Sequence, residues 1–169
     1  ITDGDGDTST ATLAISIGDS PAAITFVPSV GEGTIVSEVG LPETRANGNV
    51  ESPGSNPELP VEATTGTITF LSPDGVASVS LGGTVITPGA LPQQVFADAT
   101  GTLVVTTYNY NPTTGIGSVT YSYTLTDNTN ANVNPMDIFA VVVTDSDGDV
   151  ASANLTISII DDVPTARND

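Results

Sequence analysis

The sequence contains no cysteine, no histidine and no tryptophan among its 169 residues. Without cysteine it can form neither a disulfide nor a thiolate–metal bond, and without histidine it lacks the imidazole of a catalytic triad. Zinc, copper and iron sites are therefore disfavoured, because these metals prefer nitrogen and sulfur ligands. The carboxylate and carbonyl oxygens that remain are the ligands that Ca²⁺ and Mg²⁺ prefer.

Basic residues are also scarce. Arg45 and Arg167 are opposed by twenty acidic residues, so the net charge is −18. This charge repels phosphate backbones and anionic lipid surfaces, and we expect neither nucleic acid nor a membrane as a partner. No apolar run approaches the roughly 18 residues that a membrane-spanning helix needs. The acidic excess opposes compaction unless cations neutralise it.

The two ends of the sequence are similar to each other. Residues 1–19 (ITDGDGDTSTATLAISIGD) and 143–161 (VTDSDGDVASANLTISIID) are identical at 11 of 19 positions, at an offset of 142 and without a gap. Such a fixed period is typical of tandem repeats. We therefore expect a fragment of a longer chain: residues 1–18 form the last strand of one repeat, 19–162 form a complete domain, and 163–169 form the linker to the next repeat.

Apolar and polar residues alternate with a period of two over much of the intervening sequence, which is typical of β-strands. The alternation is clear at 119–125 and 155–159, and residues 138–144 (IFAVVVT) have the composition of a more fully buried strand. Further strands are predicted at 11–17, 22–27, 66–72, 76–81 and 102–108. Seventeen glycines and twelve prolines separate these runs, and no stretch has a helical period. The sequence predicts an all-β fold, a sandwich of antiparallel sheets.

Two polar segments and a set of tyrosines complete the pattern. Residues 40–60 (GLPETRANGNVESPGSNPELP) are predicted to form a long exposed loop without an assigned role, and residues 127–137 a second polar loop. The tyrosines lie at strand spacing, and we expect core or cross-strand positions rather than a binding site for Tyr108, Tyr110, Tyr121 and Tyr123.

The motif Asp145-Ser146-Asp147-Gly148-Asp149 lies between two predicted strands, and its Asp-Gly pair favours a hairpin turn. A turn requires only one aspartate, whereas three carboxylates at alternate positions repel one another unless a cation such as Ca²⁺, which takes six to eight oxygens, neutralises them. The motif does not have the spacing of an EF-hand. We predict that it both turns the chain and binds Ca²⁺ through Asp145, Asp147 and Asp149, and equally in the first copy through Asp3, Asp5 and Asp7.

Each copy of the motif is followed by a later aspartate near a proline. In an immunoglobulin-like sandwich the last hairpin lies at the pole where the first strand begins, so Asp19 is expected near the aspartate-rich turn. A metal there would bridge linker and domain. Asp161 and Asp162 are interpreted either as ligands at the next junction or as a solvated linker. Glu38 and Asp127 are weaker candidates, for which solvation is the favoured interpretation over metal binding.

Several strings resemble the repeat, roughly 143 residues long, of the giant RTX adhesins that Gram-negative bacteria export by type I secretion. They are GTITFLSPDGVASVSLGG, YSYTLTDN, VSEVGLP and, most specifically, FAVVVTDSDGDVASANLTISIIDDVPTA. The resemblance covers essentially the whole chain and implies an immunoglobulin-like β-sandwich with Ca²⁺ at its linkers. It also implies an extender that projects a distal ligand-binding region from the cell surface for adhesion and biofilm formation. The first copy departs from the pattern, because Ser20 stands where the second has Asp162.

We therefore predict a monomeric, extracellular, structural module of a bacterial surface protein, not an enzyme, whose partners are neighbouring repeats of the same chain. Two alternatives stay open. The first is a module that itself binds a sugar or protein, which only the 40–60 loop favours. The second is a carbohydrate-active enzyme with paired carboxylates, which the absence of tryptophan and an aromatic content of 5% disfavour.

Overall fold

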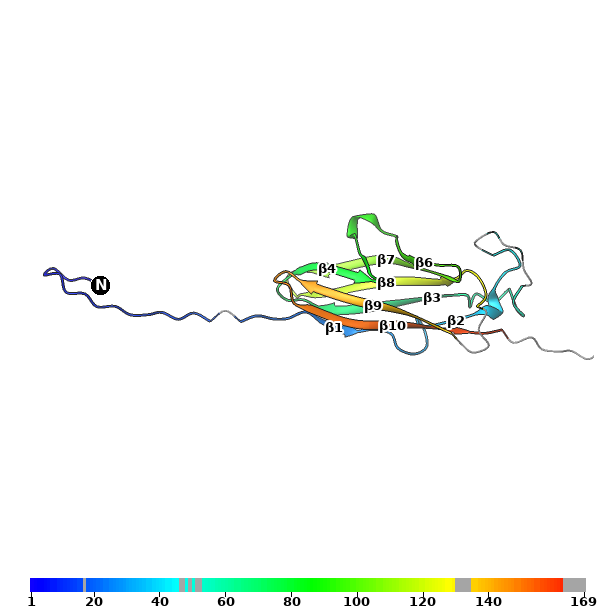
Figure 1. Ribbon diagram of the computed structural model, residues 1–169, viewed down its shortest axis with the longest axis horizontal. Helices are drawn as coiled ribbons and strands as arrows, with labels where there is room; N and C mark the ends of the chain where they lie inside the picture. The colour runs from blue at the N-terminus through cyan, green and yellow to red at the C-terminus, as the bar shows by residue number, and fades with distance from the viewer. Residues whose placement is uncertain (17, 46–47, 49, 51–52, 130–134, 163–169) are drawn as a thin grey trace, which may run out of the picture.

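The computed structural model describes residues 1–169 except 17, 46–47, 49, 51–52, 130–134 and 163–169. Two β-sheets pack face to face, and the first residues of the chain extend away from one end of them (Figure 1). Two short 3-10 helices, η1 (Glu38–Gly40) and η2 (Pro88–Ala90), lie in the connections. The strands are β1 (Ala23–Phe26), β2 (Ile35–Ser37), β3 (Ala63–Leu71), β4 (Val76–Leu81), β5 (Thr84–Val85), β6 (Gln93–Ala97), β7 (Gly101–Asn111), β8 (Ile116–Leu125), β9 (Met136–Asp145) and β10 (Val150–Ile160).

The strand order is that of an immunoglobulin-like sandwich. One sheet has the order β1-β3-β8-β7-β6 and the other β2-β10-β9-β4-β5. The letters A to G of that fold can be assigned, in chain order, to β1, β3, β4, β7, β8, β9 and β10. With these letters, one sheet contains A-B-E-D and the other C-F-G, as the fold requires. The predicted all-β sandwich is confirmed, with one difference: β2 pairs with β10 in parallel, so the second sheet is mixed rather than antiparallel.

The core lies between the sheets and consists of the apolar positions of the alternating strands. In β8, Tyr121 and Tyr123 are fully buried, and they face inward with Leu155 and Ile157 of β10, which are also fully buried. Burial of each large apolar side chain contributes about 1.5–3 kcal/mol. The Tyr121 hydroxyl remains satisfied because it donates to the carbonyl oxygen of Gly33 at 2.8 Å.

All four tyrosines have the structural positions that the sequence predicted. Tyr108 and Tyr110 are partly buried and pack against the core through the ring of Phe70, whose centroid lies 6.3 Å from that of Tyr108 and 6.2 Å from that of Tyr110. The Tyr123 hydroxyl donates to the carboxylate of Asp137. These contacts make the tyrosines part of the sandwich rather than an exposed aromatic site.

The predicted strand at 11–17 is wrong for residues 11–16, which form no strand; residue 17 lies outside the described residues. Leu13 and Ile15 are 82% and 74% exposed, because no strand among the described residues covers them. Three strands of two to five residues were not predicted from the sequence: β2, β5 and β6. Short edge strands of this kind carry too few alternating positions to be recognised.

Most of the described residues of the 40–60 segment are exposed, as predicted, but a few of them are buried against the domain. Leu41 and Arg45 are only 1% and 5% exposed, and Thr44 forms an isolated bridge with Val50. In the second polar segment, residues 130–134 lie outside the described residues, and β9 already begins at Met136.

The chain enters the sandwich at one pole, and its last described strand ends at the opposite pole. The N-terminal segment approaches from one end of the long axis and joins β1 there, close to the turn between β9 and β10 (Figure 1). Strand β10 then runs the length of the molecule and ends at the other pole, where Ile160 pairs with Ser37. The segment that enters β1 and the end of β10 are therefore separated by the length of the sandwich.

Candidate metal centre at the incoming linker

The β9–β10 turn is built around the side chain of Asp145. Its carboxylate oxygen Oδ1 accepts hydrogen bonds from the backbone N–H groups of Gly148 at 3.0 Å and Asp149 at 2.7 Å. The N–H of Asp145 donates to the carbonyl oxygen of Asp149 at 3.0 Å, and Gly148 provides the positive φ of 107° that closes the turn. Asp145 is fully buried, whereas Asp147 and Asp149 are exposed at the tip.

The incoming linker, residues 18–22, donates backbone hydrogen bonds to two carboxylates at this pole. The N–H of Ala22 donates to Oδ2 of Asp145 at 3.1 Å, and the N–H of Ser20 donates to Oδ2 of Asp74 at 2.8 Å. The side chain of Asp19, which precedes both donors, has a carboxylate oxygen within 4.8 Å of oxygens of Asp74 and Asp147, and it raises the pKa of Asp147 and Asp149. The structure thus places Asp19 against the last hairpin, as the sequence analysis expected.

Asp74, which lies in the turn between β3 and β4, was not predicted from the sequence. This turn meets the β9–β10 turn because Val76 of β4 pairs with Asp145 of β9. The approach is close: a Cβ added to Gly75 would lie 2.4 Å from Oγ of Ser146. The Pro73-Asp74-Gly75 tripeptide is a turn signal, but only the pairing of β4 with β9 shows that the two turns adjoin.

Two groups of carboxylates result, and they share one residue. The turn cluster consists of Asp145, Asp147 and Asp149, and the linker cluster of Asp19, Asp74 and Asp147; within each cluster, one oxygen per residue lies within 4.8 Å of the others. Calcium–oxygen distances are about 2.3–2.6 Å, so oxygens bound to one ion lie up to about 5 Å apart. Both clusters have the spacing and the hard oxygen donors that fit Ca²⁺.

Proximity of the carboxylates changes their protonation. Hydrogen bonds with Asp145 and then with Asp19 raise the pKa of Asp147 to about 6. The pKa of Asp149 is also raised, chiefly by its hydrogen bond with Asp19. Burial acts to raise the pKa of Asp145, but hydrogen bonds from Asp147 and from three backbone N–H groups together lower it. In the absence of a cation, the centre therefore takes up protons to relieve the repulsion between its carboxylates.

The first copy of the motif, residues 3–7, forms the same turn as residues 145–149. Among the described residues, it lacks the linker and the β3–β4 turn that complete the centre at the other copy. The N–H of Asp3 donates to the carbonyl of Asp7 at 3.0 Å, and the N–H of Asp7 donates to Oδ1 of Asp3 at 3.0 Å. The bridge between Thr2 and Thr8 corresponds to the pairing of Thr144 with Val150. The carboxylates of Asp3, Asp5 and Asp7 form a similar group, but all three are exposed, and no linker or β3–β4 turn among the described residues adjoins them.

No family model matches the chain, no curated protein does, and no solved structure does. The resemblance to RTX adhesin repeats therefore stays a prediction based on the quoted strings. Among the described residues, no helix is long and apolar enough to cross a membrane.

The remaining predicted ligands lie at the opposite pole and contact protein groups. Oε1 of Glu38 accepts from the N–H and the hydroxyl of Thr129, both at 2.6 Å, and Asp127 lies 3.5 Å from Nε of the buried Arg45. Asp161 and Asp162 line a pocket of about 360 Å³ together with Glu38. In the described part of the chain, none of these four acidic residues belongs to a group with metal-ligand spacing.

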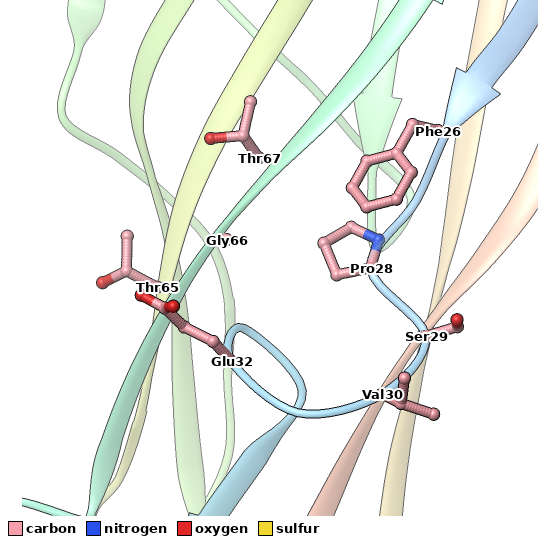
Figure 2. A pocket seen from close by; sticks show the side chains of 8 residues that line it. All are labelled: Phe26, Pro28, Ser29, Val30, Glu32, Thr65, Gly66 and Thr67. Atoms are coloured by element: carbon pink, nitrogen blue, oxygen red, sulfur yellow. The ribbon is translucent and has the colours of Figure 1, made fainter.

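The larger surface groove, about 470 Å³, lies elsewhere on the sandwich and has few charged residues in its lining. Figure 2 shows it between Phe26 and Pro28 on one side and the strand carrying Thr65 and Thr67 on the other. Glu32 is the one carboxylate among the residues that line it, whereas glycoside hydrolysis uses a pair. Among the described residues, the carboxylate groups with metal-ligand spacing lie at the incoming linker and in the first copy of the motif.

Proposed function

We propose that this chain is a structural extender module, in which Ca²⁺ at the incoming linker fixes the direction of the preceding module. The observation that carries this proposal is the placement of Asp19: the linker presents its carboxylate to the last hairpin of the domain it enters. A cation bound there would connect two segments that only hydrogen bonds otherwise hold together.

The charge of the centre supports a divalent cation. Five carboxylates from three segments face one another, and both basic residues of the chain lie elsewhere in the sequence, at Arg45 and Arg167. At neutral pH, above the raised pKa of Asp147, these groups repel unless a cation is bound. Oxygen-rich extracellular sites bind Ca²⁺ with Kd values on the order of 10⁻⁴–10⁻³ M. Binding free energy then adds to folding free energy, and the domain becomes most stable where calcium is abundant.

The N-terminal segment supports a tandem arrangement. Its exposed Leu13 and Ile15 correspond, at the offset of 142, to Leu155 and Ile157 of β10, which are fully buried. The segment thus has the inward-facing residues of a last strand and no sheet to cover them. In the proposed array, this strand belongs to the preceding repeat, and the array is part of an extracellular adhesin of the RTX type.

The proposal is tested by small-angle X-ray scattering of two consecutive repeats in Ca²⁺ and in EDTA. We expect a longer maximum dimension in Ca²⁺, and a smaller, broader pair-distance distribution after chelation. Asp147→Asn in the second repeat should give the EDTA profile even in Ca²⁺. Glu58→Gln in the same repeat changes an exposed acid in the 40–60 loop, at the pole away from the joint, and should behave like the unaltered chain. Identical profiles in Ca²⁺ and EDTA would contradict the proposal.

A further inference from the structure

The outgoing end of the chain is held by a residue of the 40–60 loop. Both carboxylate oxygens of Asp162 accept hydrogen bonds from Ser55: Oδ2 from its N–H at 2.5 Å, and Oδ1 from its hydroxyl at 2.8 Å. The two residues are 107 positions apart in sequence. A two-oxygen contact with a charged acceptor is stronger and more directional than a single neutral hydrogen bond.

The loop around Ser55 is itself fastened to the domain. The N–H of Gly54 donates to the carbonyl of Leu41 at 2.8 Å, and the N–H of Asn56 donates to the carbonyl of Val39 at 3.0 Å. A Cβ at Gly54 would lie 2.3 Å from the carbonyl oxygen of Glu38, so the loop packs directly on η1. Both neighbours of Ser55 are thus hydrogen-bonded to the domain. The N–H and the hydroxyl of Ser55 are therefore already positioned to donate to Asp162.

The internal repeat shows what the same positions do at the other pole. At the offset of 142, Asp161 corresponds to Asp19 and Asp162 to Ser20. Asp19 contacts the carboxylates of the domain that the linker enters, and the N–H of Ser20 donates to Asp74 of that domain. Ile160, immediately before Asp161, still pairs with β2 of its own domain. No spacer residue therefore separates the sheet of one domain from the contacts with the next.

We propose that residues 53–56 form a clamp, which needs no metal, on the outgoing linker. At the joint between two copies, the dipeptide Asp161-Asp162 is then bound by both domains, the preceding one and the following one. This inference rests on the proposed function, because it takes a further copy of this domain as the partner. Asp161 contacts the metal centre of that following copy, while the side chain of Asp162 stays bound to Ser55 of the preceding one. The 40–60 loop thereby acquires a role: it sets the direction in which the chain leaves the domain.

A consequence is that joints within one array differ. The joint entered through Ser20 lacks the carboxylate that accepts both Ser55 hydrogen bonds, so the preceding domain cannot hold it in this way. Such a joint keeps only the contacts with the following domain. A single substitution at this position therefore converts a joint held on both sides into one held on one side.

The test uses the complete chain in EDTA, so that calcium has no part in the result. The exchange rate of the Ser55 amide hydrogen and the heteronuclear NOE of the Asp162 amide are measured by NMR. Asp162→Ser, which copies the first junction, should speed the exchange at Ser55 at least about tenfold and lower the NOE at residue 162. Ser55→Ala removes only the hydroxyl bond and should have a smaller effect of the same sign.

Glu58→Ser is the matched control, because it removes one exposed negative charge from the same loop. It should leave both signals unchanged. Unaltered exchange at Ser55 in Asp162→Ser, or an equal change in Glu58→Ser, would overturn the clamp. Either result would leave the calcium centre untouched, whereas absence of calcium binding would remove the proposed function and leave this hydrogen-bonded contact in place.

Discussion

The buried carboxylate of Asp145 accepts a hydrogen bond from the backbone N–H of Ala22 at 3.1 Å, across 123 residues of sequence. The last hairpin of the domain thus holds the start of its first strand directly. The same carboxylate also closes its own turn through Gly148 and Asp149. Linker geometry and hairpin geometry are therefore coupled even before a cation is considered.

Asp145→Ala should lower the Tm by several degrees, because it leaves three backbone N–H groups without their acceptor at a buried position. Asp3→Ala is the matched control, since Asp3 closes the equivalent turn in an exposed segment outside the sandwich. It should leave the Tm unchanged. Thermal unfolding followed by circular dichroism in EDTA checks both variants, and equal shifts for the two would show that the buried contact contributes nothing.

In EDTA the domain should become less stable as the pH rises from about 4 through 6. The pKa of Asp147 is raised to about 6 in the folded chain from an ordinary 3.8, so the folded state holds this proton more tightly than the unfolded state. The lowered pKa of Asp145 acts in the opposite sense, but only below its ordinary value. Denaturant unfolding at pH 5 and pH 7 measures the difference.

Calcium should reverse this pH dependence, because Ca²⁺ takes the place of the proton and binds the ionised carboxylates. At saturating Ca²⁺ the domain should therefore be more stable at pH 7 than at pH 5. Asp147→Asn should make the free energy of unfolding in EDTA less dependent on pH. A domain that is more stable at pH 7 than at pH 5 in EDTA would show that Asp147 does not have its raised pKa.

Asp74→Asn should weaken Ca²⁺ binding about tenfold or more, since it removes one charged ligand of the linker cluster. The amide oxygen can still accept from the N–H of Ser20, so the fold should be preserved. Glu58→Gln removes an exposed negative charge away from the centre and should bind as the unaltered chain does. Calcium titration of the three chains is the measurement, and equal affinities would exclude Asp74 from the centre.

Leu155→Ala should cost about 2–5 kcal/mol of unfolding free energy, because the side chain is fully buried between the sheets. Leu13→Ala, at the corresponding position of the first copy, should cost almost nothing, since that residue is 82% exposed. Urea unfolding of both variants makes the comparison. A large effect of Leu13→Ala would mean that residues 1–18 are part of this domain's core.

Prediction from sequence succeeded where a pattern is local. Strand β4 has the predicted bounds, 76–81, because alternating residues and flanking glycines define it without reference to neighbours. The same local pattern predicted a strand at 11–17, where the described residues lack the partner strand that pairing requires. A strand pattern indicates which face of a strand is apolar, but it does not indicate whether a sheet is present to cover that face.

The candidate site was only partly predictable for the same reason. The duplicated motif indicated Asp145, Asp147 and Asp149, and the expected topology indicated Asp19. Asp74 required the pairing of β4 with β9, which brings two turns together across the sandwich. Glu38 and Asp127 were chosen by charge alone, and their contacts with Thr129 and Arg45 became visible only in the structure.

The most direct test of this account is isothermal titration of Ca²⁺ into the complete chain at neutral pH and physiological ionic strength. We expect saturable binding with a Kd on the order of 10⁻⁴–10⁻³ M, a release of protons that grows as the pH is lowered toward 6, and loss of the signal in Asp147→Asn. A titration that shows no heat of binding and no proton release, with a domain that melts at the same temperature in Ca²⁺ and EDTA, would contradict it.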